Sequence, residues 1–244
     1  EFLKVLDLFF EVYESIKVIK DFWFRLSLPN FSGKNKEKYG GDLKLWQWAS
    51  KVIFSACQKR KINLMQGLGE AAFYGPKLDI QIKNIYGKEE TLATIQVDIL
   101  VPKRMGLSYV DEKNNEKNPI IIHRAIIGSY ERFIGFLLEA TKGDLPFWLS
   151  PIQVLILPVL KNHQDYAEEV LRKLEENNFR VKIWQAEETL SKRIFFAEEE
   201  KIPAILVIGD KEIKNKTCSL RLRPKQDLGE KKIEEIIEYF YKLR

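Results

Sequence analysis

The stretch from residue 123 to residue 138 constrains this chain most, because a short strand leads through a glycine directly into a helix. The residues before Gly128 are rich in isoleucine, which is typical of a strand. Ser129 stands where a helix N-cap belongs, and its hydroxyl can accept a hydrogen bond from a backbone N–H of the first turn. The apolar residues that follow recur at the spacing of one helix face, namely Tyr130, Phe133, Ile134, Leu137 and Leu138. We therefore expect a strand, a tight turn and an amphipathic helix in direct succession.

Arg132 falls in the first turn of this expected helix, outside its apolar face. Helix N-termini favour acids, so an arginine there is costly unless an anion lies beside it. Phosphate groups bind readily at helix N-termini, and one interpretation of Arg132 is therefore a phosphate site. The alternative is a surface arginine paired with Glu131 or another acid, and spacing alone favours this alternative.

Composition narrows the class of protein. A chain of 244 residues with 45% hydrophobic residues can form one large domain or two ordinary ones. A net charge of +5 is compatible with a nucleic-acid partner but does not establish one. Cys57 and Cys218 lie too far apart in sequence for a CxxC metal site and predict no disulfide framework, so a reducing cytosol is the default location. No apolar run approaches about 18 residues, and we expect no membrane span and no membrane partner.

The beginning of the chain already follows a helical pattern. Glu1 is not a methionine, and the apolar residues from Phe2 to Tyr13 recur at helical spacing without a preceding cap. We expect the chain to be the C-terminal portion of a longer polypeptide.

The first part of the chain mixes helices with strands. We expect helices at 1–17 and 42–61, the second capped by Asp42, and strands at 18–28, 63–66, 77–85 and 91–100. In the last two strands apolar and polar residues alternate, and a turn at 86–88 favours a hairpin. One sheet face should therefore be apolar and buried. The other should carry carboxylates and amides that can hold an ammonium group or a ribose, although an ordinary solvated face is the alternative.

The charged loop at 33–41 is interpreted as a solvated connector, with contact to RNA phosphates as the less favoured alternative.

From residue 151 the pattern changes to alternating strands and helices. We expect strands at 153–159, 179–184, 204–208 and 217–223, and helices at 165–177, 188–200 and 231–244. This alternation implies right-handed βαβ units and a mostly parallel sheet. The predicted fold is α+β over residues 1–146, followed by α/β over residues 147–244, with a hinge at 142–149.

Four sequence blocks carry a family resemblance. G-S-Y-E-R-F-I-G at the head of the central helix closely resembles motif 3 of class II aminoacyl-tRNA synthetases, and in particular that of threonyl-tRNA synthetases. The blocks GEAAFYGPK at 69–77, TIQVD at 94–98 and PFWLSPIQV at 146–154 extend the resemblance. It implies a partial antiparallel-sheet catalytic domain at 1–146, with motif 3 at 123–138 and without motifs 1 and 2. It also implies an anticodon-binding domain at 147–244.

The resemblance implies an activity and its partners. In that family threonine and ATP, with Mg²⁺, form threonyl-adenylate, and the acyl group then moves to tRNA(Thr). Such enzymes are homodimers, and catalysis consists mainly of positioning and charge neutralisation.

The resemblance also implies roles for individual residues around the nucleotide and the amino acid. Arg132 matches the motif 3 arginine, a catalytic residue that contacts ATP. Gly128 and Ser129 match the turn at which the nucleotide approaches the backbone. The residues that match the aminoacyl-adenylate pocket are Tyr74, Lys77 and Gln96.

His123 matches one of three zinc ligands in the family, where zinc binds the amino and hydroxyl groups of threonine. The other two ligands would come from upstream sequence, as would motif 1 and the motif 2 arginine. Spacing alone would make a lone histidine in an apolar strand a structural residue.

Several positions depart from the family pattern. Thr91 stands where bacterial members carry a glutamine, and Ala186 and Phe195 stand where members often have arginines, in the region that reads the anticodon. The remaining candidates for contacts to tRNA are Arg193, Arg221 and Arg223.

Three functional hypotheses follow. The first is the C-terminal part of a threonine–tRNA ligase, inactive by itself because half of its site lies upstream. The second is a non-aminoacylating tRNA-binding paralogue or companion subunit, with an upstream domain that edits mischarged seryl-tRNA. The third is a non-enzymatic RNA binder, whose RNA affinity falls with salt and which binds no ATP.

Overall fold

The structure is a computed structural model that describes residues 1–16, 21–32 and 36–243. The chain divides into two compact units, Glu1–Lys142 and Gly143–Arg244, called here the N-terminal unit and the C-terminal unit. The boundary expected from the sequence lies after residue 146. The start of the strand expected at 18–28 and part of the loop expected at 33–41 lie outside the described residues.

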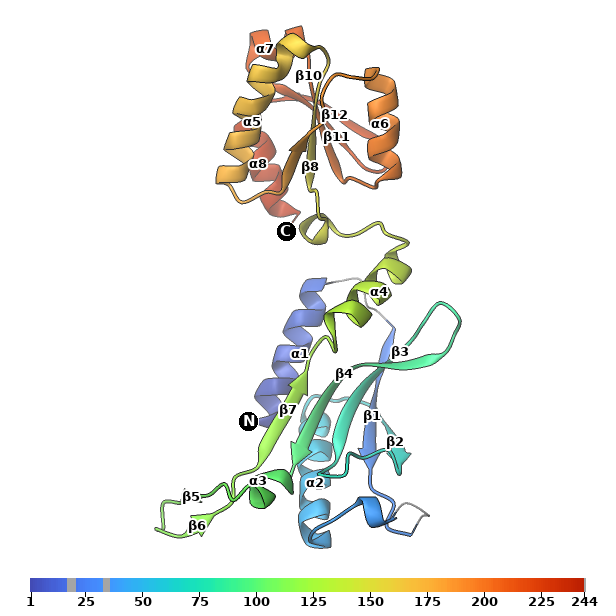
Figure 1. Cartoon of the computed structure of the whole chain (residues 1–244), viewed down its shortest axis with the longest axis vertical. Helices are drawn as coiled ribbons and strands as arrows, with labels where there is room; N and C mark the ends of the chain where they lie inside the picture. The colour runs from blue at the N-terminus through green and yellow to red at the C-terminus, as the bar shows by residue number, and fades with distance from the viewer. Residues whose placement is uncertain (17–20, 33–35, 244) are drawn as a thin grey trace. The chain divides into compact units, whose positions relative to one another are not determined.

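A five-stranded sheet forms the centre of the N-terminal unit, in the order β2-β1-β3-β4-β7 (Figure 1). Its strands are β1 (Phe22–Leu28), β2 (Leu64–Leu68), β3 (Lys77–Lys83), β4 (Glu89–Asp98) and β7 (Ile121–Ala125). β1 and β2 run parallel, and every other neighbouring pair in this sheet is antiparallel. The expected hairpin between β3 and β4 is confirmed, because the Asn84 N–H donates to the Lys88 carbonyl across the turn at 3.0 Å.

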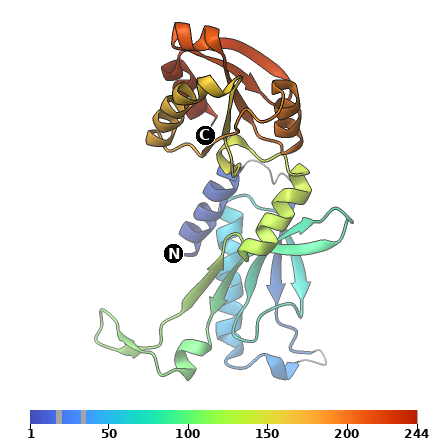
Figure 2. The ribbon, with the colours of Figure 1, turned by 45° about the horizontal axis from the view of Figure 1, so that its top comes forward.

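Two helices, α1 (Phe2–Ile16) and α2 (Leu43–Lys59), cover one face of this sheet (Figures 1 and 2). Phe9 of α1 lies edge-on to Phe24 of β1, with ring centroids 5.6 Å apart. Trp46 of α2 and the thiol of Cys57 are fully buried. The predicted cap of α2 is confirmed, because the Asp42 carboxylate accepts the Lys44 N–H at 2.9 Å. Burial of aromatic and aliphatic side chains between these layers is the main stabilising term of the unit.

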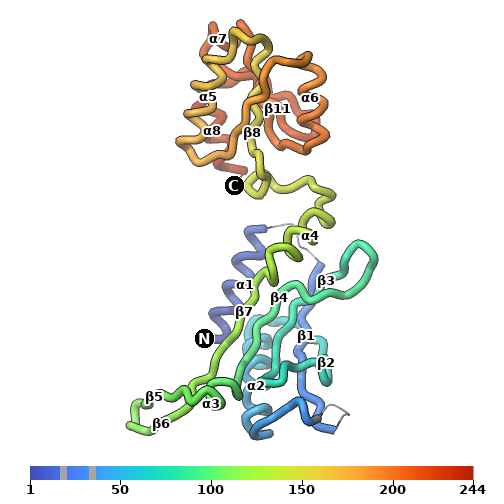
Figure 3. The backbone as a smooth tube through the Cα atoms, viewed as in Figure 1, coloured from blue at the N-terminus to red at the C-terminus, as the bar shows by residue number. Residues whose placement is uncertain are grey.

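The segment between β4 and β7 is more ordered than the polar loop that the sequence suggested. It contains α3 (Val101–Arg104) and a small hairpin of β5 (Tyr109–Val110) and β6 (Glu116–Lys117), visible in the tube of Figure 3. Asp111 closes the hairpin, since its Oδ1 accepts the N–H groups of Lys113 and Asn115, both at 2.9 Å.

A short 3₁₀ helix, η1 (Lys36–Lys38), precedes α2.

The helix after β7, α4 (Tyr130–Thr141), begins where the sequence predicted. Ser129 caps it by accepting the Arg132 N–H at 3.4 Å. The expected apolar face is only partly buried: Phe133 and Leu137 are covered, whereas Tyr130 is 74% exposed. The helix leaves the end of β7 and passes beyond the sheet (Figure 1), so only one line of its side chains finds a packing surface.

The C-terminal unit also contains a five-stranded sheet, in the order β12-β11-β10-β8-β9. Its strands are β8 (Val154–Pro158), β9 (Val181–Ile183), β10 (Ala204–Ile208), β11 (Cys218–Leu222) and β12 (Gln226–Lys231). β9, β8 and β10 are parallel, as the βαβ pattern predicted, but β11 and β12 are antiparallel. The expectation of a mostly parallel sheet thus holds for only three strands. The connections at 209–217 and 223–225, which lead into β11 and β12, are shorter than the crossover that joins parallel strands.

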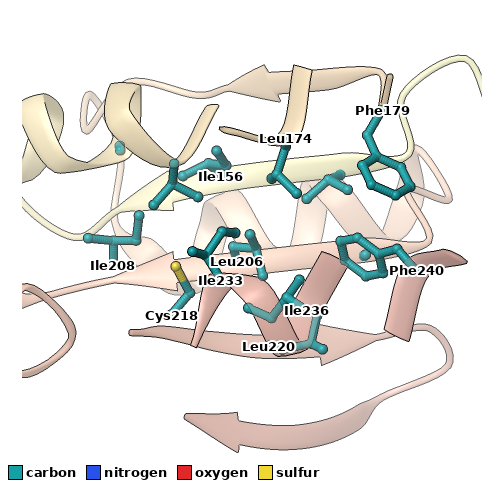
Figure 4. Close-up of a cluster of buried hydrophobic side chains, with 14 of the residues drawn as sticks. Ile156, Leu174, Phe179, Leu206, Ile208, Cys218, Leu220, Ile233, Ile236 and Phe240 are labelled. Carbon is teal, nitrogen blue, oxygen red and sulfur yellow. The ribbon is translucent and has the colours of Figure 1, made fainter. Parts of the chain in front are cut away.

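Helices cover both faces of this sheet. These helices are α5 (Gln164–Glu176), α6 (Leu190–Glu199), α7 (Asp210–Asn215) and α8 (Ile233–Lys242), and short 3₁₀ turns lie at η2 (Phe147–Leu149) and η3 (Lys161–His163). α5 and α8 lie on one face and α6 on the other (Figure 1). Ile156 of β8 therefore packs in the α5–α8 core with Leu174 and Phe240 (Figure 4), whereas its neighbour Leu155 packs on the α6 side. This double burial explains the uninterrupted apolar run of β8.

None of the described helices combines the length and the apolar character needed to cross a bilayer.

Candidate active site on the polar face of the N-terminal sheet

Two rows of polar side chains cross the N-terminal sheet on the face away from α1 and α2. Because side chains alternate along each strand, Arg25 and Ser27 point away from the helix side to which Phe24 belongs. The strand register then aligns one row as Ser27, Lys77, Gln96 and His123, and the next row as Arg25, Asp79, Thr94 and Ala125. Residues directly opposite each other on neighbouring strands share a face and touch, so β1, β3, β4 and β7 build one polar surface.

Asp79 is the centre of this surface and is completely buried. Its Oδ2 accepts hydrogen bonds from Ser27 Oγ at 2.7 Å and Lys77 Nζ at 2.8 Å, and its Oδ1 accepts one from Thr94 Oγ1 at 2.8 Å. Arg25 Nη2 lies 3.8 Å from Oδ2. A buried carboxylate is tolerated only when it is paired and hydrogen-bonded in this way. The network fixes the position of the Lys77 ammonium group.

Tyr74, Gln96 and His123, which the sequence singled out from separate blocks, lie together on this surface. The Tyr74 hydroxyl donates to Gln96 Oε1, and the Tyr74 ring centroid is 5.2 Å from that of His123. Burial, followed by the charges of Asp98 and Asp79, raises the pKa of Tyr74 and favours its neutral, hydrogen-donating form. Gly75 allows the chain to reach this position, since a Cβ there would overlap the Val97 carbonyl oxygen.

His123 is held by a carboxylate that the sequence analysis did not assign to the site. Its Nε2 lies 2.8 Å from Oδ2 of Asp98, whose side chain is 1% exposed, while the His123 side chain is 44% exposed. The signal was present in the sequence, because Asp98 follows Gln96 by two residues and so points to the same side of β4. Ser27 and Arg25 could have been found by the same alternation in β1.

The residues present fit one zinc ligand but not a complete zinc site. The Nδ1 atom of His123 makes no hydrogen bond with any described residue, and its ring is accessible. Within residues 1–16, 21–32 and 36–243, however, no group of three His, Cys, Asp or Glu side chains is arranged to hold a metal, whereas zinc takes at least three protein ligands. Cys57 and Cys218 are buried free thiols, and burial raises the pKa of each to about 12.

The turn after β7 places Gly128, Ser129 and Arg132 at the other end of β4. Gly128 has a φ of +67°, and a Cβ there would lie 2.6 Å from the Leu92 carbonyl oxygen. Arg132 Nη2 donates to the Thr91 carbonyl at 3.1 Å and lies 3.6 Å from Glu90 Oε2. The acid beside Arg132 is therefore Glu90 rather than Glu131.

Arg132 remains available to a ligand. Its side chain is 60% exposed, and exposed ion pairs of this kind contribute little energy. Gln96 lies five residues along β4 from Thr91, which separates the two groups by about 17 Å at ~3.3 Å per residue. The site is thus an elongated strip along β4, with a cation at one end and the Tyr74–Gln96–His123 cluster further along it.

The three candidate tRNA-binding arginines of the C-terminal unit differ sharply in exposure. Arg193 is only 4% exposed. Its guanidinium donates to the carbonyls of Glu188 and Pro158 at 3.0 and 2.9 Å and, more weakly, to those of Trp184 and Val159. The donors of Arg193 are used inside the fold, where they hold the N-terminus of α6 against the end of β8. Its expected contact with tRNA stays a prediction.

Arg221 and Arg223 border a common cavity of about 260 Å³. The side chain of Arg221 is 43% exposed and that of Arg223 is 18% exposed. Arg221 Nη2 pairs with Asp227 at 3.3 Å, and Arg223 Nη2 pairs with Asp144 at 2.8 Å. Arg221 Nε and Arg223 Nη1 are buried and have no hydrogen-bond partner among the described residues. Because the fold encloses both atoms, these two donors are not presented to a ligand.

Comparisons with known proteins agree with these two units. The family model described as "tRNA synthetase class II core domain (G, H, P, S and T)" matches residues 7–141, and the model described as "Anticodon binding domain" matches residues 153–243. A threonine–tRNA ligase from Geobacillus kaustophilus is 40% identical over 222 residues, which are 91% of this chain and 34% of that protein. A threonine–tRNA ligase from Cytophaga hutchinsonii is 40% identical over 240 residues, covering 98% of this chain and 37% of that protein.

Solved structures show the same arrangement of elements. The crystal structure described as the RNA binding domain of threonyl-tRNA synthetase from Cryptosporidium parvum Iowa II has a TM-score of 0.87 at 33% identity, over 99% of this chain and 59% of that chain. A putative threonyl-tRNA synthetase from Aeropyrum pernix has a TM-score of 0.72 at 28% identity, over 98% of this chain and 59% of that chain. The predicted fold, α+β followed by α/β, is confirmed.

The chain spans about a third of the length of these curated relatives, 34% and 37% in the two cases above. It belongs to the class II tRNA synthetase core family, and its two units match the C-terminal portion of a threonyl-tRNA synthetase.

Proposed function

We propose that this chain is the C-terminal part of a threonine–tRNA ligase that attaches threonine to tRNA(Thr) through threonyl-adenylate. The observation that carries the proposal is the polar strip along β4. It aligns Lys77, Gln96 and His123 in register, with Tyr74 bonded to Gln96. The exposed Arg132 of α4 contacts Thr91 near the other end of β4. The sequences of relatives named threonine–tRNA ligase support the same reaction.

The residues of the strip suit a reaction that depends on positioning. Arg132 would contact the phosphates of ATP, whose Mg²⁺ enters with the substrate, and Gly128 and Ser129 would let the nucleotide approach the backbone. Tyr74, with its raised pKa, would donate to a neutral or anionic oxygen of the adenylate, together with Lys77 and Gln96. His123 would be one of the zinc ligands, and the zinc would supply a Lewis acid for the amino and hydroxyl groups of threonine.

The C-terminal unit would bind the tRNA. Arg221 and Arg223 have partly exposed side chains beside a cavity, whereas Arg193 stabilises the fold from within. We expect the whole protein to act as a homodimer in the cytoplasm.

The test is threonine-dependent exchange between ATP and pyrophosphate. We expect none from the 244-residue chain and clear activity from a longer chain that adds the motif 1 and motif 2 region. In the longer chain Arg132→Ala should reduce the exchange by about 100-fold or more, as for removal of a group that stabilises transition-state charge, whereas Arg104→Ala, on α3, should not. A longer chain that is folded and loaded with zinc but shows no exchange would contradict the proposal.

A second candidate is a tRNA-binding companion that does not aminoacylate, with an editing domain upstream. One observation favours it: Phe195, where family members often carry an arginine, is 57% exposed, and Arg193 is buried. Unchanged tRNA(Thr) affinity in the Arg221→Ala and Arg223→Ala variants would count against both candidates.

A further inference from the structure

We propose that Lys38 and Tyr39 are positioning residues, which hold the segment at 69–75 and thereby fix Tyr74 in the candidate active site. Both residues belong to the loop at 33–41, for which the sequence predicts a solvated connector. The inference deepens the proposed function, because its consequence for threonine binding rests on that function. Its structural part rests on hydrogen bonds, burial and ring contacts within the N-terminal unit.

The segment at 69–75 joins β2 to β3 and is irregular, so its backbone groups need partners from other parts of the fold. The Leu28 carbonyl, at the end of β1, accepts the N–H groups of Gly69 and Ala71 at 2.8 and 3.4 Å. These two bonds fix the N–H side of the segment. Its carbonyl groups require donors from elsewhere in the chain.

The carbonyl groups of the same two residues are bound by Tyr39 and Lys38. The Tyr39 hydroxyl donates to the Gly69 carbonyl at 2.6 Å, and Lys38 Nζ donates to the Ala71 carbonyl at 2.8 Å. Burial, followed by the charge of Glu70, raises the pKa of Tyr39, so the phenol keeps its proton and acts as the donor. Gly69 and Ala71 are thus held through both their N–H and their carbonyl groups.

Tyr39 is itself fixed by the core of the N-terminal unit. Its side chain is buried, and its ring lies edge-on to those of Phe31 and Trp46, with centroids 5.9 and 5.6 Å apart. The completely buried Trp46 of α2 also donates through Nε1 to the Gly40 carbonyl at 2.8 Å. The position of the Tyr39 hydroxyl is therefore determined by packing against α2.

The other end of the segment carries Tyr74, which follows Gly69 by five positions. The Tyr74 carbonyl accepts the Ile99 N–H at 3.0 Å, and the Tyr74 hydroxyl donates to Gln96. The segment is thus anchored at Gly69 by Tyr39 and at Tyr74 by the residues of β4 and just after it. Losing the first anchor should lengthen the free stretch of chain before Tyr74 and loosen its position.

The experiment is hydrogen–deuterium exchange of single amides, followed by NMR, in the 244-residue chain. In the unmodified chain the amides of Gly69, Ala71 and Ile99 should exchange far more slowly than in an unfolded chain, because each donates to a carbonyl. Exchange of Gly69 or Ala71 at the unfolded rate would overturn the proposal. This result needs no variant, so it stands even if a variant fails to fold.

The variant Tyr39→Phe gives the causal test, because it keeps the ring and removes only the hydroxyl that binds Gly69. We expect the amides of Gly69, Ala71 and Ile99 to exchange about 3- to 10-fold faster, the factor that corresponds to one lost hydrogen bond. The Ile99 amide is decisive, since it reports on Tyr74 and a merely structural bond at Gly69 would not affect it. Faster exchange at Gly69 and Ala71 alone, or equally faster exchange throughout the N-terminal unit, would overturn the positioning role.

The variant Lys38→Met tests the second donor, because it keeps the apolar stem and removes the ammonium group. It should speed the exchange of Ala71, and an unchanged rate would remove Lys38 from the proposal.

The matched control is Tyr13→Phe. The Tyr13 hydroxyl is also buried in the N-terminal unit, but it has no hydrogen-bond partner among the described residues. The substitution therefore removes a buried hydroxyl without breaking a bond to the segment. Exchange of Gly69, Ala71 and Ile99 should stay as in the unmodified chain.

The consequence for threonine binding is tested in the longer chain that carries the motif 1 and motif 2 region. Tyr74 lies with Gln96, about 17 Å along β4 from Thr91 and the neighbouring Arg132. Tyr39→Phe should therefore raise the KM for threonine by about 3- to 10-fold and change the KM for ATP by less than about twofold. An equal rise in both KM values, or none in either, would overturn this part. A longer chain without any exchange of pyrophosphate would contradict the proposed function, whereas the amide exchange would still decide whether Lys38 and Tyr39 position Tyr74.

Discussion

At the scale of single residues, Gly128 shows how tightly the backbone is packed where β7 leads into α4. Its φ of +67° lies in the left-handed region, and its α-carbon hydrogen takes the place of a Cβ that would lie 2.6 Å from the Leu92 carbonyl oxygen. The side chain of Arg132 reaches Thr91, the neighbour of Leu92, at 3.1 Å. The close approach at Gly128 therefore helps to place the arginine of the strip.

The variant Gly128→Ala should destabilise the N-terminal unit through backbone strain and the clash with Leu92. Gly87→Ala is the matched control, because Gly87 also has a positive φ, +74°, but no atom within 4 Å of its Cβ position. The left-handed conformation costs an L-residue about 1–2 kcal/mol, and the clash should add to that cost only at Gly128. Thermal unfolding followed by circular dichroism should give a lower Tm for Gly128→Ala than for Gly87→Ala. Equal melting temperatures would show that the chain relaxes away from Leu92.

At the scale of elements, α7 and β12 are joined by the carboxylate of Glu230. Its Oε1 accepts hydrogen bonds from Asn215 Nδ2 at 2.7 Å and from Thr217 Oγ1, and its Oε2 pairs with Lys211 Nζ at 2.7 Å. These contacts, first of all the hydrogen bond from Lys211, lower the pKa of Glu230 from 4.5 to about 2. Neither α7 nor β12 is expected from the sequence, and this polar cluster holds the two elements together.

The depressed pKa of Glu230 predicts a pH dependence with a definite sign. A carboxyl group that is more acidic in the folded state stabilises the fold above its unfolded pKa, and this stabilisation is lost as pH falls. The loss should occur between about pH 4.5 and pH 2, the ordinary and lowered pKa values of Glu230. Glu230→Gln should flatten this part of the curve of urea midpoint against pH. The control Glu238→Gln, on the exposed side of α8, should keep the slope of the unmodified chain, and an identical slope in all three proteins would contradict the assignment.

At the scale of the whole molecule, the chain consists of two units that each bury their own core. The C-terminal unit encloses Ile156, Leu206 and Phe240 without any contribution from residues before Gly143 (Figure 4). A domain with its own hydrophobic core can in general fold alone.

We therefore expect residues 143–244, expressed alone, to fold cooperatively. Circular dichroism should show helix and strand, and urea should unfold the unit in a single transition. Phe240→Ala should lower its stability by about 3–5 kcal/mol because the ring is completely buried, whereas Tyr241→Ala, at a half-exposed position, should cost less. A non-cooperative transition in the unmodified unit would show that it needs the N-terminal unit to fold.

Local patterns were sufficient to predict most elements of this protein. The alternation in β3 and β4, the Asp42 and Ser129 caps and the apolar run of β8 all depend on residues within a few positions of one another. Resemblance to a family added the grouping of Tyr74, Gln96 and His123, which lie in separate blocks of the sequence. Hydrophobic periodicity and helix caps depend on residues that are close in sequence. Both can therefore be recognised before any tertiary contact is known.

Only the tertiary structure decided which of these residues contact one another and which are buried. The row from Lys77 to His123 depends on the register of three strands, and the bond between His123 and Asp98 joins positions 25 residues apart. The burial of Arg193 depends on carbonyls up to 35 residues away. Register and desolvation are set by packing between distant segments, and no local pattern carries that information.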